Sequence, residues 1–264
     1  MTLVSSYRDH RELFLNLTLR ELRSKYKRSF LGWAWSLVTP LATMAVYTIV
    51  FKLFFRAHPD RGVHHLDVFS LWLMCALLPW TFFSTGMMSS IGSLVGNSSL
   101  ISKTYFDRRL LPAATVGAAL VTHLIEMGLL VVVLVGFGDW NALAFLPMVV
   151  VLIVITALAA LGMGLLLSAL NVYFRDIEYL MSIVLMIWFY LTPVIYPIAT
   201  AKKYAKFIKI NPMTELTNCF RAVLYYGRFP TALDLGYSVG FAAVAMAVGW
   251  TVFNRLQGGF AEEL

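Results

Sequence analysis

Long apolar stretches alternate with short polar ones along the chain, and this alternation defines the predicted elements. The apolar stretches cover about residues 30–55, 68–95, 111–137, 145–170, 179–197 and 235–253. The first four exceed the roughly 20 residues that a helix needs to cross a bilayer, the sixth comes close to that length, and the fifth is short unless it continues past its prolines. The pattern predicts an all-α polytopic membrane protein with six transmembrane helices.

The fifth apolar stretch is interrupted by Pro193 and Pro197. Proline donates no backbone hydrogen bond and disfavours helical backbone in the residue before it, so this helix should stop or bend near Thr192. A broken backbone is tolerated in hydrocarbon only where protein or a water-filled cavity shields it. We expect a kinked or re-entrant helix here, at the mouth of a pathway.

The first 29 residues are basic and amphipathic, with seven Lys or Arg and three acidic residues. Plotted at 100° per residue, Leu15, Leu19, Leu22 and Tyr26 form an apolar stripe beside a polar one. Such a segment is typical of a helix lying in the membrane interface. It either contacts lipid headgroups or a partner, or only orients the chain by the positive-inside rule.

The chain therefore divides into a cytoplasmic amphipathic segment, residues 1–29, and a membrane domain, residues 30–264. Six crossings place both termini in the cytoplasm. In this topology, 12 of the 21 Lys and Arg lie inside, so the bias is weak and depends on the N-terminal segment. We expect a multi-pass protein of the cytoplasmic (inner) membrane.

Residues 97–110, between the second and third spans, combine an N-cap signal at Asn97 with a small apolar face. A short amphipathic helix held there by two long helices suits docking into a partner's groove. An ordinary charged turn is the alternative. The candidate docking residues are Ser98, Leu100, Ile101, Lys103, Tyr105, Phe106, Asp107 and Arg108.

Residues 198–234 alternate apolar and basic positions before the last span. Asn211 followed by Pro212 predicts the N-cap and first position of a helix over about 213–226, which carries Arg221. Two short helices that dip into the outer leaflet as a gate would fit, and an extracellular loop without a gating role is the alternative. The candidate gate residues are Pro193, Pro197, Asn211, Pro212 and Arg221.

Composition agrees with a membrane protein and excludes several kinds of site. The chain is 59% hydrophobic and 13% charged, with a net charge of +7, whereas soluble domains carry about a quarter charged residues. The positive charge suits anionic lipid or an anionic substrate better than nucleic acid. No Gly-Lys pair exists, so the chain has no P-loop, and it shows no catalytic or metal-binding motif.

His123 and Glu126 are an ionisable pair three residues apart inside the third predicted span. An intramembrane pair of this kind is a functional candidate by default. A proton relay would need further acidic or His residues deep in other spans, and we find none. A bundle-facing structural pair, or a polar patch on a pathway, is the better interpretation.

Aromatic residues make up 14% of the chain. Aromatic faces can stack on the C–H faces of sugar rings, although most membrane aromatics belong to the core or the interfacial belt. The candidates for a sugar path are Trp35, Tyr47, Phe82, Phe83, Trp188, Tyr190 and Tyr196.

Four stretches together resemble one family: Leu19–Pro40, Asn171–Pro197, Ile210–Gly227 and Phe253–Leu264. They look like the ABC-2 permease subunit of polysaccharide ABC exporters, the transporters of O-antigen, teichoic acid and capsule. The resemblance implies a homodimer paired with two copies of a separate ABC ATPase, which binds ATP and Mg²⁺. This chain would bind no cofactor and would not be an enzyme. The substrate would be a glycan on a polyprenyl diphosphate lipid.

The resemblance also implies roles for particular segments. Residues 7–28 would be the interface helix, residues 97–110 the coupling helix that seats in the ATPase, and residues 198–230 the gate helices. The diphosphate would be attracted by a basic segment at the cytoplasmic boundary. Its members are Arg20, Arg23, Lys25, Tyr26, Lys27 and Arg28.

Other functions remain open from the sequence alone. An ABC-2 exporter of small molecules or drugs is the nearest alternative, followed by a membrane-embedded enzyme acting on a polyprenyl lipid. A proton-coupled carrier is disfavoured because internal repeats and deep carboxylates are not evident. The identity of the glycan does not follow from the sequence.

Overall fold

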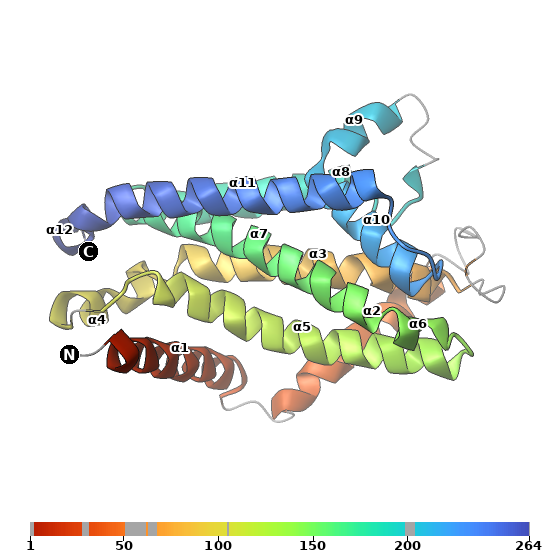
Figure 1. Cartoon of the computed structure of the whole chain (residues 1–264), viewed down its shortest axis with the longest axis horizontal. Helices are drawn as coiled ribbons and strands as arrows, with labels where there is room; N and C mark the ends of the chain where they lie inside the picture. Colours follow the sequence, from red (N-terminus) through yellow and green to blue (C-terminus); the bar gives the residue numbers. More distant parts are fainter. Residues whose placement is uncertain are drawn as a thin grey trace.

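The computed structural model describes residues 3–27, 32–50, 62, 68–104, 106–198 and 204–263, and over these residues the chain is helical without strands. Figure 1 shows the long helices side by side in one bundle, with the first and last helices at the same end. In chain order the elements are α1 (Leu3–Tyr26), a 3-10 turn (Gly32–Ala34), α2 (Trp35–Thr48), α3 (Phe69–Ile91), a second 3-10 turn (Val95–Asn97), α4 (Ser98–Lys103), α5 (Leu110–Gly136), α6 (Asn141–Ala144), α7 (Leu146–Tyr173), α8 (Ile177–Leu191), α9 (Ala205–Ile210), α10 (Pro212–Leu224), α11 (Ala232–Leu256) and, after a third 3-10 turn (Gln257–Gly259), α12 (Phe260–Glu263).

Four helices among the described residues are long and apolar enough to cross a membrane: α3, α5, α7 and α11. They coincide with the predicted second, third, fourth and sixth spans, so the prediction of an all-α polytopic membrane protein is confirmed. The predicted first span is represented by α2, with 14 residues, and its two ends fall outside the described residues. The fifth is represented by α8, with 15 residues. A count of six complete spans stays a prediction.

The predicted break in the fifth apolar stretch is confirmed. Helix α8 ends at Leu191, and Thr192 leaves the helical region with φ −97° and ψ 129°. This backbone is what a residue immediately before a proline prefers, because the ring of Pro193 would clash with helical backbone at Thr192. The chain turns there and reaches α9 and α10 instead of continuing as one span.

Among the described helices, α7 and α11 share the most extensive contact, and two glycines allow their backbones to approach closely. A Cβ added to Gly249 would meet the carbonyl group of Gly162, and a Cβ added to Gly162 would meet the backbone at Ala245. The two backbones therefore touch, as small residues allow in membrane helix packing. Helix α3 lies in the middle of the bundle and is buried along nearly its whole length.

Helix α1 packs against the N-terminal half of α5 (Figure 1). Phe14 and Thr18 lie in contact distance of Gly117, where a Cβ would be within 3.1–3.3 Å of them. The predicted apolar stripe packs only in part: Leu15 and Leu19 are 45% and 44% exposed, whereas Leu22 is buried. The bundle-facing side carries Leu17, Thr18 and Leu22, which are buried.

Helix α1 thus has two apolar faces. The periodicity of Leu15, Leu19 and Leu22 indicated an apolar stripe, and tertiary packing buries Leu22 together with Leu17 but leaves Leu15 and Leu19 exposed. The exposed leucines remain available to lipid, and placement of α1 in the membrane interface stays a prediction.

Candidate functional site

The predicted coupling segment, residues 97–110, contains the short helix α4. Ile101 is 5% exposed and belongs to a core cluster with Leu94 and Leu111, and Leu100 and Phe106 pack partly against the same cluster. The apolar face expected to enter a partner's groove is therefore largely used within this chain. Ser99, Ser102 and Lys103 point outward and are exposed. Tyr105 lies outside the described residues, and the docking role stays a prediction.

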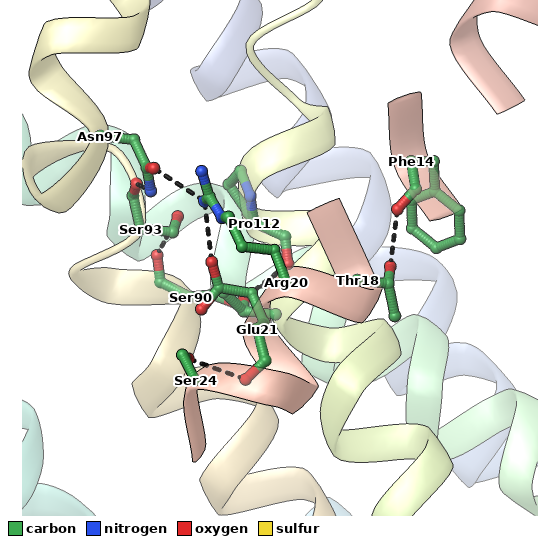
Figure 2. Close-up of polar contacts among 10 residues, drawn as sticks. Phe14, Thr18, Arg20, Glu21, Ser24, Ser90, Ser93, Asn97 and Pro112 are labelled. Carbon is green, nitrogen blue, oxygen red and sulfur yellow. Dashed lines mark hydrogen bonds and ion pairs between the residues drawn. The ribbon is translucent and has the colours of Figure 1, made fainter. Parts of the chain in front are cut away.

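Polar contacts join this segment to α1. An Arg20 guanidinium nitrogen donates to Asn97 Oδ1 at 2.8 Å and pairs with Glu21 at 2.8 Å (Figure 2). Asn97 in turn donates from Nδ2 to the Ser93 carbonyl at 2.8 Å. Helix α1 and the start of α4 are therefore linked through Asn97, a link that sequence spacing could not indicate because the two residues lie 77 positions apart.

The segment is also linked to the C-terminal end of the chain. Arg108 donates to the backbone carbonyl of Gln257, and the Arg109 guanidinium lies 4.0 Å from the ring centroid of Trp250. Asp107 accepts a hydrogen bond from the Arg109 backbone N–H at 3.1 Å. Side chains of residues 97–110 therefore contact both α1 and the C-terminal end of the chain.

The predicted basic segment is only partly described. The side chains of Arg20, Arg23, Lys25 and Lys27 are exposed. Tyr26 is the last residue of α1. Arg28 lies outside the described residues. The exposed cations are at the C-terminal end of α1, where they also interact favourably with the negative end of the helix dipole.

At the opposite end of the bundle, Asn211 joins α8 to α10. Its side-chain oxygen accepts from the Met213 backbone N–H at 3.1 Å and from Trp188 Nε1 at 2.7 Å. Its amide nitrogen donates to Thr192 Oγ1 at 2.8 Å and to the Leu191 carbonyl at 3.2 Å. The predicted N-cap at Asn211, with Pro212 at the first helical position, is confirmed. The cap also binds the broken end of α8, which the sequence did not indicate.

Arg221 binds the same broken end from α10. Its side chain is 3% exposed and donates to the carbonyls of Trp72, Pro193 and Val194 at 3.3, 2.6 and 2.5 Å. The guanidinium lies 3.5 Å from the ring centroid of Trp72. Carbonyls released where α8 ends would otherwise be buried without partners, which is costly in a dry environment. Arg221 supplies their donors.

Glu215 and Asp234 form an acidic pair beside this unit, from α10 and the start of α11. Burial raises the pKa of the Glu215 carboxyl, and the neighbouring Asp234 raises it further. Glu215 itself is 6% exposed. The folded chain therefore holds a proton there more strongly than an exposed glutamate would.

The aromatic candidates for a sugar path occupy different environments. Phe82 and Phe83 are buried, and the ring of Phe82 stacks on His123 at 4.7 Å. Trp35 and Tyr190 are 45% and 61% exposed. The others have partners or are half-buried: Trp188 donates to Asn211, Tyr196 donates to the Tyr190 carbonyl at 2.9 Å, and Tyr47 packs against the core. Their role along a path stays a prediction.

Comparison with known proteins identifies the family. The family model for ABC-2 type transporters matches residues 12–225, most of the chain. This protein belongs to the ABC-2 type transporter family. In this ABC-2 chain, specific side chains connect residues 97–110 and α8–α10 to the rest of the bundle.

Relatives that match this ABC-2 chain over 90% or more of both lengths are named for polysaccharide export or transport. It is 31% identical to the "O-antigen export system permease protein RfbA" of Myxococcus xanthus over 99% of each chain. It is 28% identical to the protein of the same name from Klebsiella pneumoniae, over 96% of this chain and 95% of the relative. It is 23% identical to the "Polysialic acid transport protein KpsM" of Escherichia coli, over 90% of this chain and 91% of the relative.

Proposed function

We propose that this chain is the permease subunit of an ATP-driven exporter of polysaccharide. The observation that carries the proposal is similarity over nearly the whole length to O-antigen export permeases. The bundle of long apolar helices supports it. The absence of a P-loop in the sequence fits an energy source on another subunit.

The working unit in this proposal is a homodimer of this chain with two copies of an ABC ATPase that binds ATP and Mg²⁺. Residues 97–110 receive the movement of the ATPase. The hydrogen bond between Arg20 and Asn97 passes it to α1, and the contact between Arg108 and Gln257 passes it to the end of α11. Both termini lie on the ATPase side, the cytoplasmic face of the inner membrane.

The substrate in this proposal is a glycan on a polyprenyl diphosphate lipid. A diphosphate needs cations, and Arg23, Lys25 and Lys27 present exposed ones at the end of α1. The glycan passes between the two subunits and leaves beside α9 and α10, which act as the gate. Asn211 and Arg221 attach α10 to the end of α8, so in this proposal α8 and α10 move together as one unit of the gate.

Charge reversal in the basic segment tests the proposal. In cells that depend on this exporter, Arg23→Glu with Lys27→Glu should strongly reduce surface polysaccharide, and lipid-linked glycan should accumulate on the inner leaflet. The charge-matched control is Arg11→Glu with Arg255→Glu, which changes two cations outside the basic segment. Co-purification with the ATPase should be unchanged in both.

Normal export by the first double variant would remove the headgroup role. An exporter of small molecules, the alternative function, would show unchanged glycan and altered drug sensitivity after depletion of the chain.

A further inference from the structure

The imidazole of His123 is buried without a hydrogen-bond partner among the described residues. It is the middle residue of the 27-residue helix α5, and its side chain is 1% exposed. Neither ring nitrogen, Nδ1 or Nε2, has a hydrogen-bond partner among the residues that the structure describes. A neutral imidazole carries one donor and one acceptor, and burying both unpaired within a membrane span is costly. Such a group calls for a ligand or a function.

The unpaired imidazole belongs to the wall of a small polar cavity between α1, α3 and α5. The cavity measures about 60 Å³. It is closed on one side by Phe82, whose ring stacks on the imidazole. Its other lining residues supply an ammonium, a carboxylate and three hydroxyls: Lys25, Glu126, Thr81, Thr85 and Thr122, with Ala119 between them.

The charges and the size of the cavity restrict its occupant. Glu126 would repel a phosphate inside the cavity, and Lys25 would repel a cation, so with both ionised the wall is neutral overall. A ligand's hydroxyl group both donates and accepts hydrogen bonds, so it can pair with an imidazole, a carboxylate or a threonine hydroxyl of the wall. A cavity of about 60 Å³ holds the polar groups of a ligand but not a whole sugar ring.

A larger groove next to the cavity provides room for the ring. It lies between α3 and α8, measures about 500 Å³, and shares Thr85 with the cavity. Three aromatic side chains line it: Trp80, Phe189 and Tyr190. Ser84, Ser89 and Ser182 add hydroxyls. Apolar ring faces against aromatics, with hydroxyls at the edges, is the pattern by which protein sites hold carbohydrate.

We propose that the cavity around His123 binds hydroxyl groups of the sugar residue that is attached directly to the lipid diphosphate. Lys25 belongs both to the basic segment assigned to the diphosphate and to the cavity wall, so the first sugar is the one within reach. The inference rests on the proposed function and extends it: this site reads the first sugar, while the exposed cations hold the phosphates.

The test compares two kinds of probe on the permease–ATPase complex in lipid nanodiscs. One is farnesyl diphosphate, and the others are farnesyl diphosphate carrying a single glucose, galactose or N-acetylglucosamine. Equilibrium binding of the radiolabelled probes is measured. The wild-type complex should bind at least one glycosylated probe about tenfold more tightly than farnesyl diphosphate, the size of effect expected from one or two hydrogen bonds.

Substitution of His123 separates a binding role from a structural one. His123→Leu should abolish the preference for the sugar and leave affinity for farnesyl diphosphate within about twofold, a result that also reports a folded complex. His123→Gln, which still donates and accepts, should restore much of the preference. Thr251→Val, an exposed hydroxyl on α11 outside both cavity and groove, should change nothing.

Several results would overturn the proposal. They are a wild-type complex without sugar preference, a His123→Leu variant that keeps it, and a variant that loses both kinds of probe equally. If the proposed function is wrong, the result is different: the complex binds neither kind of diphosphate probe, and depletion of the chain leaves surface glycan unchanged. If glycan export is normal but the sugar preference is unchanged by substitution of His123, only the present inference is contradicted.

Discussion

The two ends of the bundle are held together in different ways. At the end away from the termini, α8 and α10 are joined by the buried Arg221 and by the four hydrogen bonds of Asn211. At the end with the termini, the polar contact between α1 and residues 97–110, from Arg20 to Asn97, is exposed, and buried apolar side chains such as Leu17 and Ile101 pack beside it. Buried networks are strong and cooperative, whereas exposed pairs contribute little and exchange readily with water.

The difference indicates which part of the chain can change shape at low energetic cost. The unit of α8 and α10 should move as a rigid piece, because separating its helices would leave buried carbonyls and a guanidinium without partners. The contacts of Arg20 can break and re-form with small changes in free energy. The polar contacts between α1 and residues 97–110 should therefore change at a lower energetic cost than those between α8 and α10.

The largest predicted effect is at Arg221. Arg221→Ala should lower the free energy of unfolding by about 3 kcal/mol or more, because three buried carbonyls lose their donors. Thermal unfolding of the detergent-solubilised chain measures the change. Arg228→Ala, at an exposed arginine four residues after Leu224, is the control and should have little effect. Equal losses for the two variants would contradict the rigid-unit interpretation.

The next largest effect concerns the contact between α7 and α11. Gly249→Ala places a methyl group against the Gly162 carbonyl, so the helices must separate. We expect a loss of about 2 kcal/mol in unfolding free energy. Gly128→Ala, at a glycine of α5 with open space around it, is the matched control and should be neutral or slightly stabilising. The same unfolding assay distinguishes them.

Asn211→Ala should destabilise the chain by about 1–2 kcal/mol, since the N-cap of α10 and the bonds to Trp188 and Thr192 are lost together. Asn211→Asp should retain the cap and the bond from Trp188 but lose the donors to Leu191 and Thr192. If the aspartate variant unfolds at a midpoint between those of wild type and Asn211→Ala, both the cap and the donated hydrogen bonds contribute to stability. Equal midpoints for the two variants would leave the cap without a contribution.

A smaller effect depends on pH. The pKa of Glu215 is raised from 4.5 to about 7 in the folded chain, so between these values the folded chain keeps a proton that the unfolded chain releases. Stability contributed by this group is thus present at low pH and falls as the pH rises through this window. Glu215→Gln should be more stable relative to wild type at pH 8 than at pH 4.5. Glu262→Gln, an exposed site, should show no such change.

Arg20→Ala should have the smallest effect on stability, below about 0.5 kcal/mol, because its partners Glu21 and Asn97 can be hydrated instead. Its effect should instead be on coupling. ATP hydrolysis by the reconstituted complex should persist while transport falls, and Arg11→Ala should change neither. A destabilisation as large as that of Asn211→Ala would end the distinction between the two ends of the bundle.

Much of the fold was predictable because its causes are local. The long apolar stretches predicted the four helices that can span a membrane, to within a few residues. Pro193 predicted the end of α8, and Asn211 with Pro212 predicted the start of α10. Each of these is set by backbone sterics and hydrogen bonding of neighbouring residues.

Predictions about faces were less successful. The predicted apolar stripe of α1 contains Leu15, Leu19 and Leu22, yet only Leu22 of these three is buried, beside Leu17 and Thr18. Ile101 was assigned to a docking face and is buried in this chain's own core. An amphipathic pattern states which side of a helix is apolar, but not whether lipid, a partner or the same chain covers it.

The sequence by itself determined the class of protein, the positions of its long helices, the break at Thr192 and the lack of a nucleotide-binding loop. These follow from composition and from interactions between close neighbours in the chain. Only the tertiary structure decided that Arg221 closes the end of α8, that Arg20 reaches Asn97, and that Lys25 shares a cavity with His123 and Glu126. Such groupings join residues far apart in sequence, so they depend on how helices pack, and no local pattern records them.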